Sequence, residues 1–399
     1  MESAIKSELL GQLALSYSLV VDPAQRVVAT RLTALPRNPR QEVDVAALVE
    51  LINKVWLGAD TAVSLRLNNK DMLQQLLALR PPRDVWIELP AAIAGVPGCA
   101  QGIQALHDNG NTLLVRHSAP GAVLPQALQP AFRYVICKGD ENSGGAVEQA
   151  YPRLDRAQSG VYSAADAREA FARGAALIIG WPFPKVSDAE PQNQDVRNNM
   201  HVIIALMQGV DSNASIEKLE ALLYRDPALA FKLIRYINSA AFGLPAEIDS
   251  FSHAIMLLGY KNLKRWLALL LVTADDDAGL RPVSFAAMRR GLMMERMGRE
   301  GGSDEQTCNE LFICGVFSLL DRTFKQPFEE LLRTIFVSDP VHQALTEGKG
   351  PFFPYLRLVR AVETGSWTSI RRSCDELLLS LTDVNQALLL SLATAHKMG

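Results

Sequence analysis

The sequence has few cysteines and no pairing pattern among them. Its five cysteines are Cys99, Cys137, Cys308, Cys314 and Cys374, and no C-x-x-C pair occurs. A disulfide framework needs an even, regularly spaced set, and a structural zinc site needs close ligand pairs. We therefore expect reduced, mostly buried thiols and no metal held by cysteine.

Long apolar runs and an excess of positive charge are also missing. The longest apolar run, near "WLALLLV", is far short of the ~20 residues that span a bilayer. The first residues, "MESAIKSELLGQLALSYSLVV", lack the basic start and continuous apolar stretch of a signal peptide. A net charge of −3 gives no general attraction to polyanions. These absences predict a cytoplasmic protein with no membrane association and no nucleic-acid partner.

The composition is that of a globular protein, and the pattern of apolar residues differs between the two halves of the chain. The chain has 399 residues with 48% apolar and 21% charged residues, which predicts two folded domains. Up to about residue 185, short strand-like runs such as "AVSLRL" and "YVICK" alternate with helix-like segments such as "DVAALVELINKVWL". This alternation predicts a parallel sheet covered by helices, and the number of units favours a barrel. Gly174 stands where a helix C-cap precedes the strand "ALIIG".

The alternation of strand-like and helix-like segments ends after the polar stretch "PKVSDAEPQNQDVRNN". Beyond it, apolar residues recur with helical spacing, and Asp226-Pro227 has the form of a helix start. The sequence thus predicts an α/β domain at 1–188, a linker at 189–198 and an all-α domain at 199–399.

Two sets of motifs resemble known families. "RDPALAFKLIRYINSAAFG" and "IDSFSHAIMLLGYKNLKRW" resemble an HDOD domain, a non-catalytic relative of the HD phosphohydrolases. "GVYSAADAREAFARGAALIIGWPFPK" resembles the end of an EAL domain, the (β/α) barrel that hydrolyses cyclic di-GMP in its active form. The early "VVATRL" lies where that family has its name motif. The chain is identified as similar to EAL-HDOD signalling proteins, with a degenerate TIM-like EAL barrel followed by a helical HDOD domain.

The resemblance implies that the barrel has lost its metal ligands. Arg31 stands at the glutamate of the name motif. In "ELPA", Glu88 is kept, but Ala91 replaces the metal-binding glutamate of the family's "ELTE". Arg116 and His117 occupy the place of the family's paired aspartates. We read Arg31, Ala91, Arg116 and His117 as degenerate active-site positions.

Three further positions stay open or altered in this comparison. The ligand asparagine is either Asn68 or lost to Leu67, depending on a one-residue shift. The family's "KxD" falls on "ICK" by strand length or on Lys138 and Asp140 by letters. Tyr162 lies near the place of a later glutamate.

These losses predict a protein without catalytic residues, metal or cofactor. Phosphodiester hydrolysis in this fold needs carboxylates and an asparagine to hold divalent metals that activate water. An arginine at a ligand position repels such an ion. Arg31, Arg116 and His117 are instead candidates for contacting an anion.

The helical half shows the same loss. Ser318-Leu319 stands where HD hydrolases carry the His-Asp metal doublet. The cations of "YKNLKRW", which are Lys261, Lys264 and Arg265, imitate a DNA-reading helix, but we interpret them as a solvated face. The run "GLMMERMG" is interpreted as core rather than as a partner groove.

The functional prediction is a catalytically inactive signal transduction protein that acts by protein–protein interaction. The resemblance places such a bacterial regulator in or beside the cyclic di-GMP network, where it bears on motility, surface attachment and biofilm formation. The partner is unidentified and is expected on the HDOD domain, cyclic di-GMP is expected to bind weakly or not at all, and a homodimer is left open. The alternatives are a non-hydrolysing receptor for cyclic di-GMP or another nucleotide, a residual phosphodiesterase and a nucleic-acid binder.

Overall fold

The computed structural model of the chain describes residues 8–38, 40–56, 61–117, 122–139, 145–186, 194–223, 251–273, 277–335 and 337–396. Three features of the sequence prediction lie outside these residues: Asp140, the segment 226–243 and the linker up to residue 193. They stay predictions.

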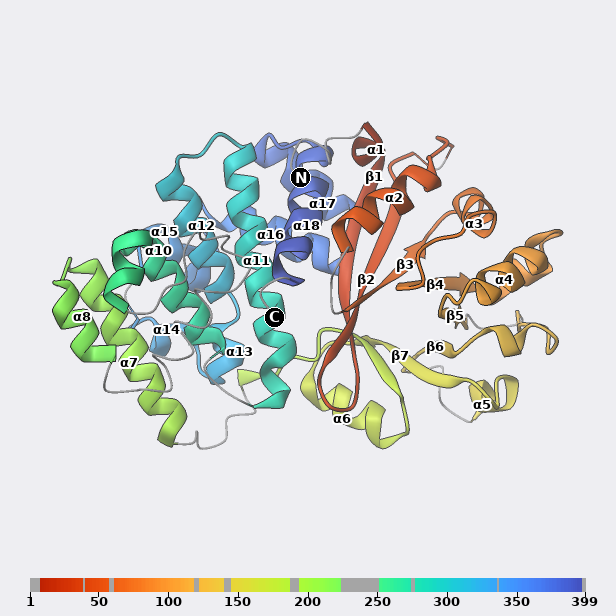
Figure 1. Cartoon of the computed structure of the whole chain (residues 1–399), viewed down its shortest axis with the longest axis horizontal. Helices are drawn as coiled ribbons and strands as arrows, with labels where there is room; N and C mark the ends of the chain where they lie inside the picture. The colour runs from red at the N-terminus through yellow and green to blue at the C-terminus, as the bar shows by residue number, and fades with distance from the viewer. Residues whose placement is uncertain are drawn as a thin grey trace. The chain divides into compact units, whose positions relative to one another are not determined.

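The first part of the chain folds into a closed barrel, as predicted. The strands follow one another around it in chain order, β1 to β8. They are β1 (Leu13–Val21), β2 (Val27–Pro36), β3 (Ala62–Leu67), β4 (Val85–Pro90), β5 (Leu113–Arg116), β6 (Tyr134–Lys138), β7 (Asp155–Val161) and β8 (Leu177–Gly180). Figure 1 shows β1 to β7 in this order, with helices on their outer side.

One strand departs from the predicted parallel arrangement. β1 pairs antiparallel with both β2 and β8, whereas the pairs from β2 to β8 are parallel. The reason is the short connection at residues 22–26. A parallel crossover needs a dozen or more residues, so this connection can only form a hairpin. Asp22 stabilises the turn by accepting from the backbone N–H of Arg26 at 2.9 Å.

Helices cover the outside of the barrel, and one of them coincides with the predicted helical segment "DVAALVELINKVWL". They are α1 (Glu8–Gln12), α2 (Val45–Trp56), α3 (Lys70–Leu77), α4 (Cys99–Asp108), α5 (Ala146–Ala150) and α6 (Ala164–Ala172). Side-chain caps begin three of them, because Asp44, Asn69 and Ser163 accept from backbone N–H groups of the first turn. Gly174 follows α6 with a φ of 81°, which confirms the predicted C-cap glycine.

The barrel interior has an apolar floor below a charged layer. Val20, Ala29, Leu114 and Ile179 belong to its buried apolar cluster. Side chains two residues further along a strand point to the same face. Arg31 therefore follows Ala29 on the inner face of β2, nearer to the strand's C-terminal end. That end of the parallel strands is the mouth of the barrel.

The rest of the chain is helical in the part that the structure describes. Its helices are α7 (Gln194–Asp211), α8 (Ile216–Leu223), α10 (Phe251–Thr273), α11 (Arg281–Glu300), α12 (Glu305–Phe317), α13 (Leu320–Phe324), α14 (Phe328–Leu331), α15 (Asp339–His342), α16 (Phe353–Thr364), α17 (Trp367–Leu377) and α18 (Leu381–His396). Gly259 interrupts α10 with a φ of 72°.

The helices α11 and α12 pack closely through glycines. An added Cβ at Gly315 of α12 would lie 2.6 Å from the backbone of Arg290. An added Cβ at Gly298 of α11 would meet the side chain of Leu311 at 2.4 Å. Met293, Met294 and Met297 are buried in α11, which confirms their interpretation as core.

Among the described helices, none alone has the length and apolar composition to cross a membrane, although the bent pair Trp367–Leu377 and Leu381–Thr394 meets both criteria jointly.

The chain divides into two compact units. The barrel unit comprises residues 1–183 with two later segments, 360–375 and 380–389, and the helical unit comprises 184–359, 376–379 and 390–399. The sequence prediction assigned both later segments to the helical domain. Asn385 ties one of them to the start of the barrel. Its side chain donates to the carbonyls of Leu10 and Leu13 at 2.7 and 2.6 Å and accepts from the N–H of Leu15 at 3.1 Å.

Candidate site at the mouth of the barrel

A buried ion pair fills the charged layer of the barrel. Arg31 donates from Nε and Nη2 to the two carboxylate oxygens of Glu88 at 2.6 and 2.5 Å. The side chains are 9% and 0% exposed. Ser64, beside Arg31 in the strand register, donates to Oε1 of Glu88 at 3.0 Å. The carboxylate kept from the family pattern is thus held by an arginine and a serine.

Two more guanidinium groups lie around this pair. Arg66 is opposite Glu88 in the register of β3 and β4, and Arg116 ends β5. The Nε atoms of both are buried without a hydrogen-bond partner. Burial, together with the charges of Arg31 and Arg116, lowers the pKa of Arg66 to about 10, while Glu88 acts against this shift. Burial lowers the pKa of Arg116 most, and Arg31 lowers it further, against the opposing effect of Glu88.

The sign of the shift at Arg66 shows what the fold does to its charge. Because the pKa in the folded protein lies below the ordinary value for arginine, folding disfavours the charged form of Arg66. This contribution destabilises the folded state fully at pH values below about 10 and is relieved as the pH rises above that value. At neutral pH the site therefore holds a cation that lacks full compensation.

The other predicted positions are dispersed. Ala91 begins a short 3₁₀ turn, Ala91–Gly95, and is buried without a ligating atom. The ring of His117 packs edge-on against Tyr151 at 5.9 Å, and its Nδ1 is buried without a partner. Lys138 is exposed at the end of β6. The structure therefore brings Arg31 and Arg116 to one charged cluster but does not place Ala91 there as a functional group.

A cavity of about 240 Å³ opens beside the cluster within the barrel unit. Arg31, Arg66 and Thr33 form part of its wall, together with Asn68. Tyr162, 69% exposed, also lines it. Asn68 and Arg116 line a second cavity of about 360 Å³, so Asn68 stands between the two.

The segment at the end of α16 closes one side of the first cavity. Glu363 and Gly365 line it. The Tyr17 hydroxyl donates to Oε1 of Glu363 at 3.4 Å, and the Trp181 indole N–H donates to its backbone carbonyl at 3.4 Å. An added Cβ on Gly365 would lie 3.1 Å from Oγ of Ser16. The chain's own late segment is therefore seated on the β1 and β8 side of the mouth.

These residues do not fit a divalent metal. A hard cation such as Mg²⁺ or Ca²⁺ takes oxygen ligands, mainly carboxylates. Here both oxygens of Glu88 already accept from Arg31, and two further arginines surround it. Across the described residues, no group of three or more His, Cys, Asp or Glu side chains has a metal-binding arrangement.

Sequence reasoning missed Arg66 and the late segment. Arg66 has a readable signal, because "AVSLRL" puts it at the end of a strand on the same face as Ser64. Glu363 lies 346 residues from Tyr17, and no local pattern connects them.

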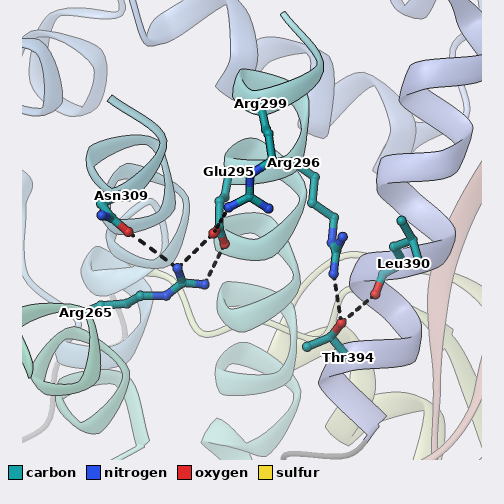
Figure 2. Close-up of polar contacts among 7 residues, drawn as sticks. All are labelled: Arg265, Glu295, Arg296, Arg299, Asn309, Leu390 and Thr394. Carbon is teal, nitrogen blue, oxygen red and sulfur yellow. Dashed lines mark hydrogen bonds and ion pairs between the residues drawn. The ribbon is translucent and has the colours of Figure 1, made fainter. Parts of the chain in front are cut away.

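The helical unit has its own buried polar cluster (Figure 2). Arg265 of α10 donates to both carboxylate oxygens of Glu295 at 2.8 and 2.5 Å, and its guanidinium lies over the ring of Phe312. Arg299 donates to the same carboxylate at 3.1 Å. Lys264 pairs with Asp211 at 2.5 Å. The interpretation of these cations as a solvated face is therefore wrong for Lys264 and Arg265, since both form ion pairs within the unit.

Ser318 closes α12 as a structural residue. Its Oγ donates to the carbonyl of Gly315 at 2.7 Å and accepts from Arg290 at 2.9 Å. Both it and Leu319 are buried. The family model of the HDOD domain matches residues 197–321, a span that ends just after this position. These residues form an HDOD domain. The family model confirms the predicted HDOD resemblance of this span, and the chain before it folds into the barrel that the resemblance implied.

Two curated relatives match part of the HDOD-containing chain. The uncharacterized protein YuxH of Bacillus subtilis is 27% identical over 166 residues, which are 41% of this chain and 39% of the relative. The cyclic di-GMP phosphodiesterase CdgJ of Vibrio cholerae is 27% identical over 172 residues, 43% of this chain and 40% of the relative. The matches span about two fifths of each relative's length.

Solved structures similar to the chain include EAL domains. The FimX EAL domain of Pseudomonas aeruginosa, bound to c-di-GMP, is 16% identical and covers 45% of this chain and 93% of its own, with a TM-score of 0.31. The EAL domain of Mycobacterium smegmatis DcpA is 14% identical and covers 42% and 90%, also with a TM-score of 0.31.

Proposed function

We propose that this protein is a non-catalytic EAL-HDOD regulator of the cyclic di-GMP network that acts through protein contacts. The observation that carries the proposal is the Arg31–Glu88 pair, because it converts the retained carboxylate of the barrel mouth into an internal counter-ion. A general base or metal ligand needs a carboxylate with free lone pairs near the substrate. The bidentate contact and the Ser64 hydrogen bond supply partners to the lone pairs of Glu88 instead.

The enzymatic alternative has one observation in its favour. A relative that shares 27% identity over 43% of this chain carries the name cyclic di-GMP phosphodiesterase. Hydrolysis by this chain would require a metal-binding carboxylate set, whereas Glu88 is paired with Arg31 and acts on the charges of Arg66 and Arg116. The charge of this site therefore supports the non-catalytic function.

The test is hydrolysis of cyclic di-GMP by the full chain with Mg²⁺ or Mn²⁺. We expect no linear dinucleotide above a protein-free blank. Turnover that rises with protein concentration and disappears with chelator would refute the proposal. On the positive side, the immobilised full chain should retain a defined cellular protein from its native lysate, and failure to retain any would remove the support for output by protein contacts.

A further inference from the structure

The cavity beside Arg66 is positively charged, as a site for an anion is, and it is large enough only for a small anion. Arg66 faces Arg31, Arg116 and Glu88 as its main charged neighbours, so three guanidinium groups are balanced by one carboxylate. The guanidinium group of Arg31 already donates two hydrogen bonds to that carboxylate. The remaining charge resides on Arg66, which lines this cavity, and on Arg116, which lines the neighbouring one. A buried cation without a counter-ion is costly, and a bound anion removes that cost.

The cavity walls supply the neutral groups that an oxyanion needs. Thr33 lies beside Arg66 in the register of β2 and β3, and both line the cavity. Asn68, two residues after Arg66, lines the same cavity and is exposed at its rim. A hydroxyl, an amide and a guanidinium around one space match the acceptor oxygens of phosphate.

The late segment of the chain sets the upper size. Glu363 and Gly365 form one wall, and about 240 Å³ remains. Pockets for drug-sized ligands occupy roughly 300–1,000 Å³. A cyclic dinucleotide, with two bases and two phosphates, is larger than this cavity, so only a part of it could enter while the segment stays in place.

We propose that this cavity binds a small phosphate-type anion at Arg66, with Asn68 and Thr33 as hydrogen-bonding groups, and that the segment Glu363–Gly365 excludes cyclic dinucleotides from it. This inference names a class of ligand for the proposed non-catalytic protein. It rests on the proposed function in one respect, which is that the barrel mouth binds no metal. Absence of phosphate binding would leave the lack of hydrolysis standing, and hydrolysis would refute the non-catalytic function whatever phosphate does.

The experiment is calorimetry of the full chain with inorganic phosphate, at constant ionic strength in chloride, accompanied by thermal melting. We expect saturable 1:1 binding and a melting temperature that rises with phosphate. Arg66→Gln should weaken binding about tenfold or more, since a charge-assisted contact is lost. It should melt no lower than the wild type without phosphate, because a disfavoured charge has been removed. If Arg66 had a purely structural role, Arg66→Gln would instead melt at a lower temperature than the wild type without phosphate.

Two further variants keep the result decisive. Arg153→Gln changes an exposed arginine just before β7, at the end of the barrel away from the mouth, and should bind phosphate as the wild type does. Asn68→Leu, at an exposed position with little risk to folding, should weaken binding several-fold. The proposal is overturned by absence of saturable binding, by equal loss in Arg66→Gln and Arg153→Gln, or by cyclic di-GMP displacing phosphate stoichiometrically from the wild type.

Discussion

At Glu88 a single carboxylate faces three guanidinium groups, and this imbalance decides how the two partners of the buried pair respond to mutation. Loss of Glu88 removes the carboxylate that pairs with Arg31 and that acts on the charges of Arg66 and Arg116. Loss of Arg31 leaves Glu88 with two cations still near it. The cost of breaking a buried pair is mainly that of the charge left behind.

We therefore expect Glu88→Gln to lower the free energy of unfolding of the barrel unit by about 3–5 kcal/mol and Arg31→Met to lower it by less. Urea titration followed by tryptophan fluorescence measures both. Glu148→Gln is the matched control, because its pair with Arg156 has one side chain 56% exposed, and it should cost at most about 1 kcal/mol. An Arg31→Met cost equal to or above that of Glu88→Gln would contradict this charge balance.

At the scale of elements, the contact of α11 and α12 depends on what each glycine faces. Gly315 meets backbone atoms of Arg290 and Gly291, which cannot move without shifting the helix. Gly298 meets Cδ1 of Leu311, the flexible end of a side chain. Overpacking costs more where the neighbour cannot give.

Gly315→Ala should therefore lower the free energy of unfolding by about 3 kcal/mol, and Gly298→Ala by about 1 kcal/mol or less. Chemical denaturation followed by helical circular dichroism is the measurement. If the two variants were equally stable, the helix contact would be looser than the structure shows.

Element identity was largely predictable from the sequence, because it depends on local spacing. The runs at 62–67 and 134–138 coincide with β3 and β6. The direction of β1 was not predicted from the alternation, although the short connection at 22–26 carries that information. The run "NELFICGVFSLLDRTF" has the apolar content of one continuous helix, yet it divides into α12 and α13 around Ser318. Its apolar spacing continues across the break, where Ser318 bonds to the carbonyl of Gly315 and to Arg290.

The candidate site was only half predictable for a related reason. Arg31 and Arg116 were identified by their motif positions, but motif comparison cannot show that Arg31 forms an ion pair with Glu88. That pairing joins residues 57 apart in the chain. The late wall of the cavity depends on still longer separations, which leave no trace in local composition.

At the scale of the whole molecule, Asn385 holds the late segment to the first strand. It satisfies two carbonyls and one N–H around Leu10 to Leu15, all of them buried. Asn385→Leu should therefore lower the free energy of unfolding by about 3 kcal/mol or more, since several buried backbone groups lose their partner.

The neighbouring Gln386 provides the control. It is 2% exposed, and its Oε1 is buried without a hydrogen-bond partner, so Gln386→Leu should be neutral or stabilising. Both free energies come from the same urea titration of the full chain. Comparable losses in the two variants would show that shape, rather than the hydrogen bonds of Asn385, accounts for the effect.

The same asparagine has a consequence for biosynthesis. Leu15 and Asn385 are separated by 370 residues, so β1 leaves the ribosome long before its partner exists. At roughly 5–20 residues per second, translation of the intervening chain takes roughly 20–70 seconds. During that interval, the backbone groups that Asn385 later binds at the start of β1 can form hydrogen bonds only with water, with a chaperone or with a non-native strand. The nascent barrel is thus most vulnerable to misassembly while the HDOD domain is being made, and its yield in a cell should depend on the supply of chaperones that bind early chains.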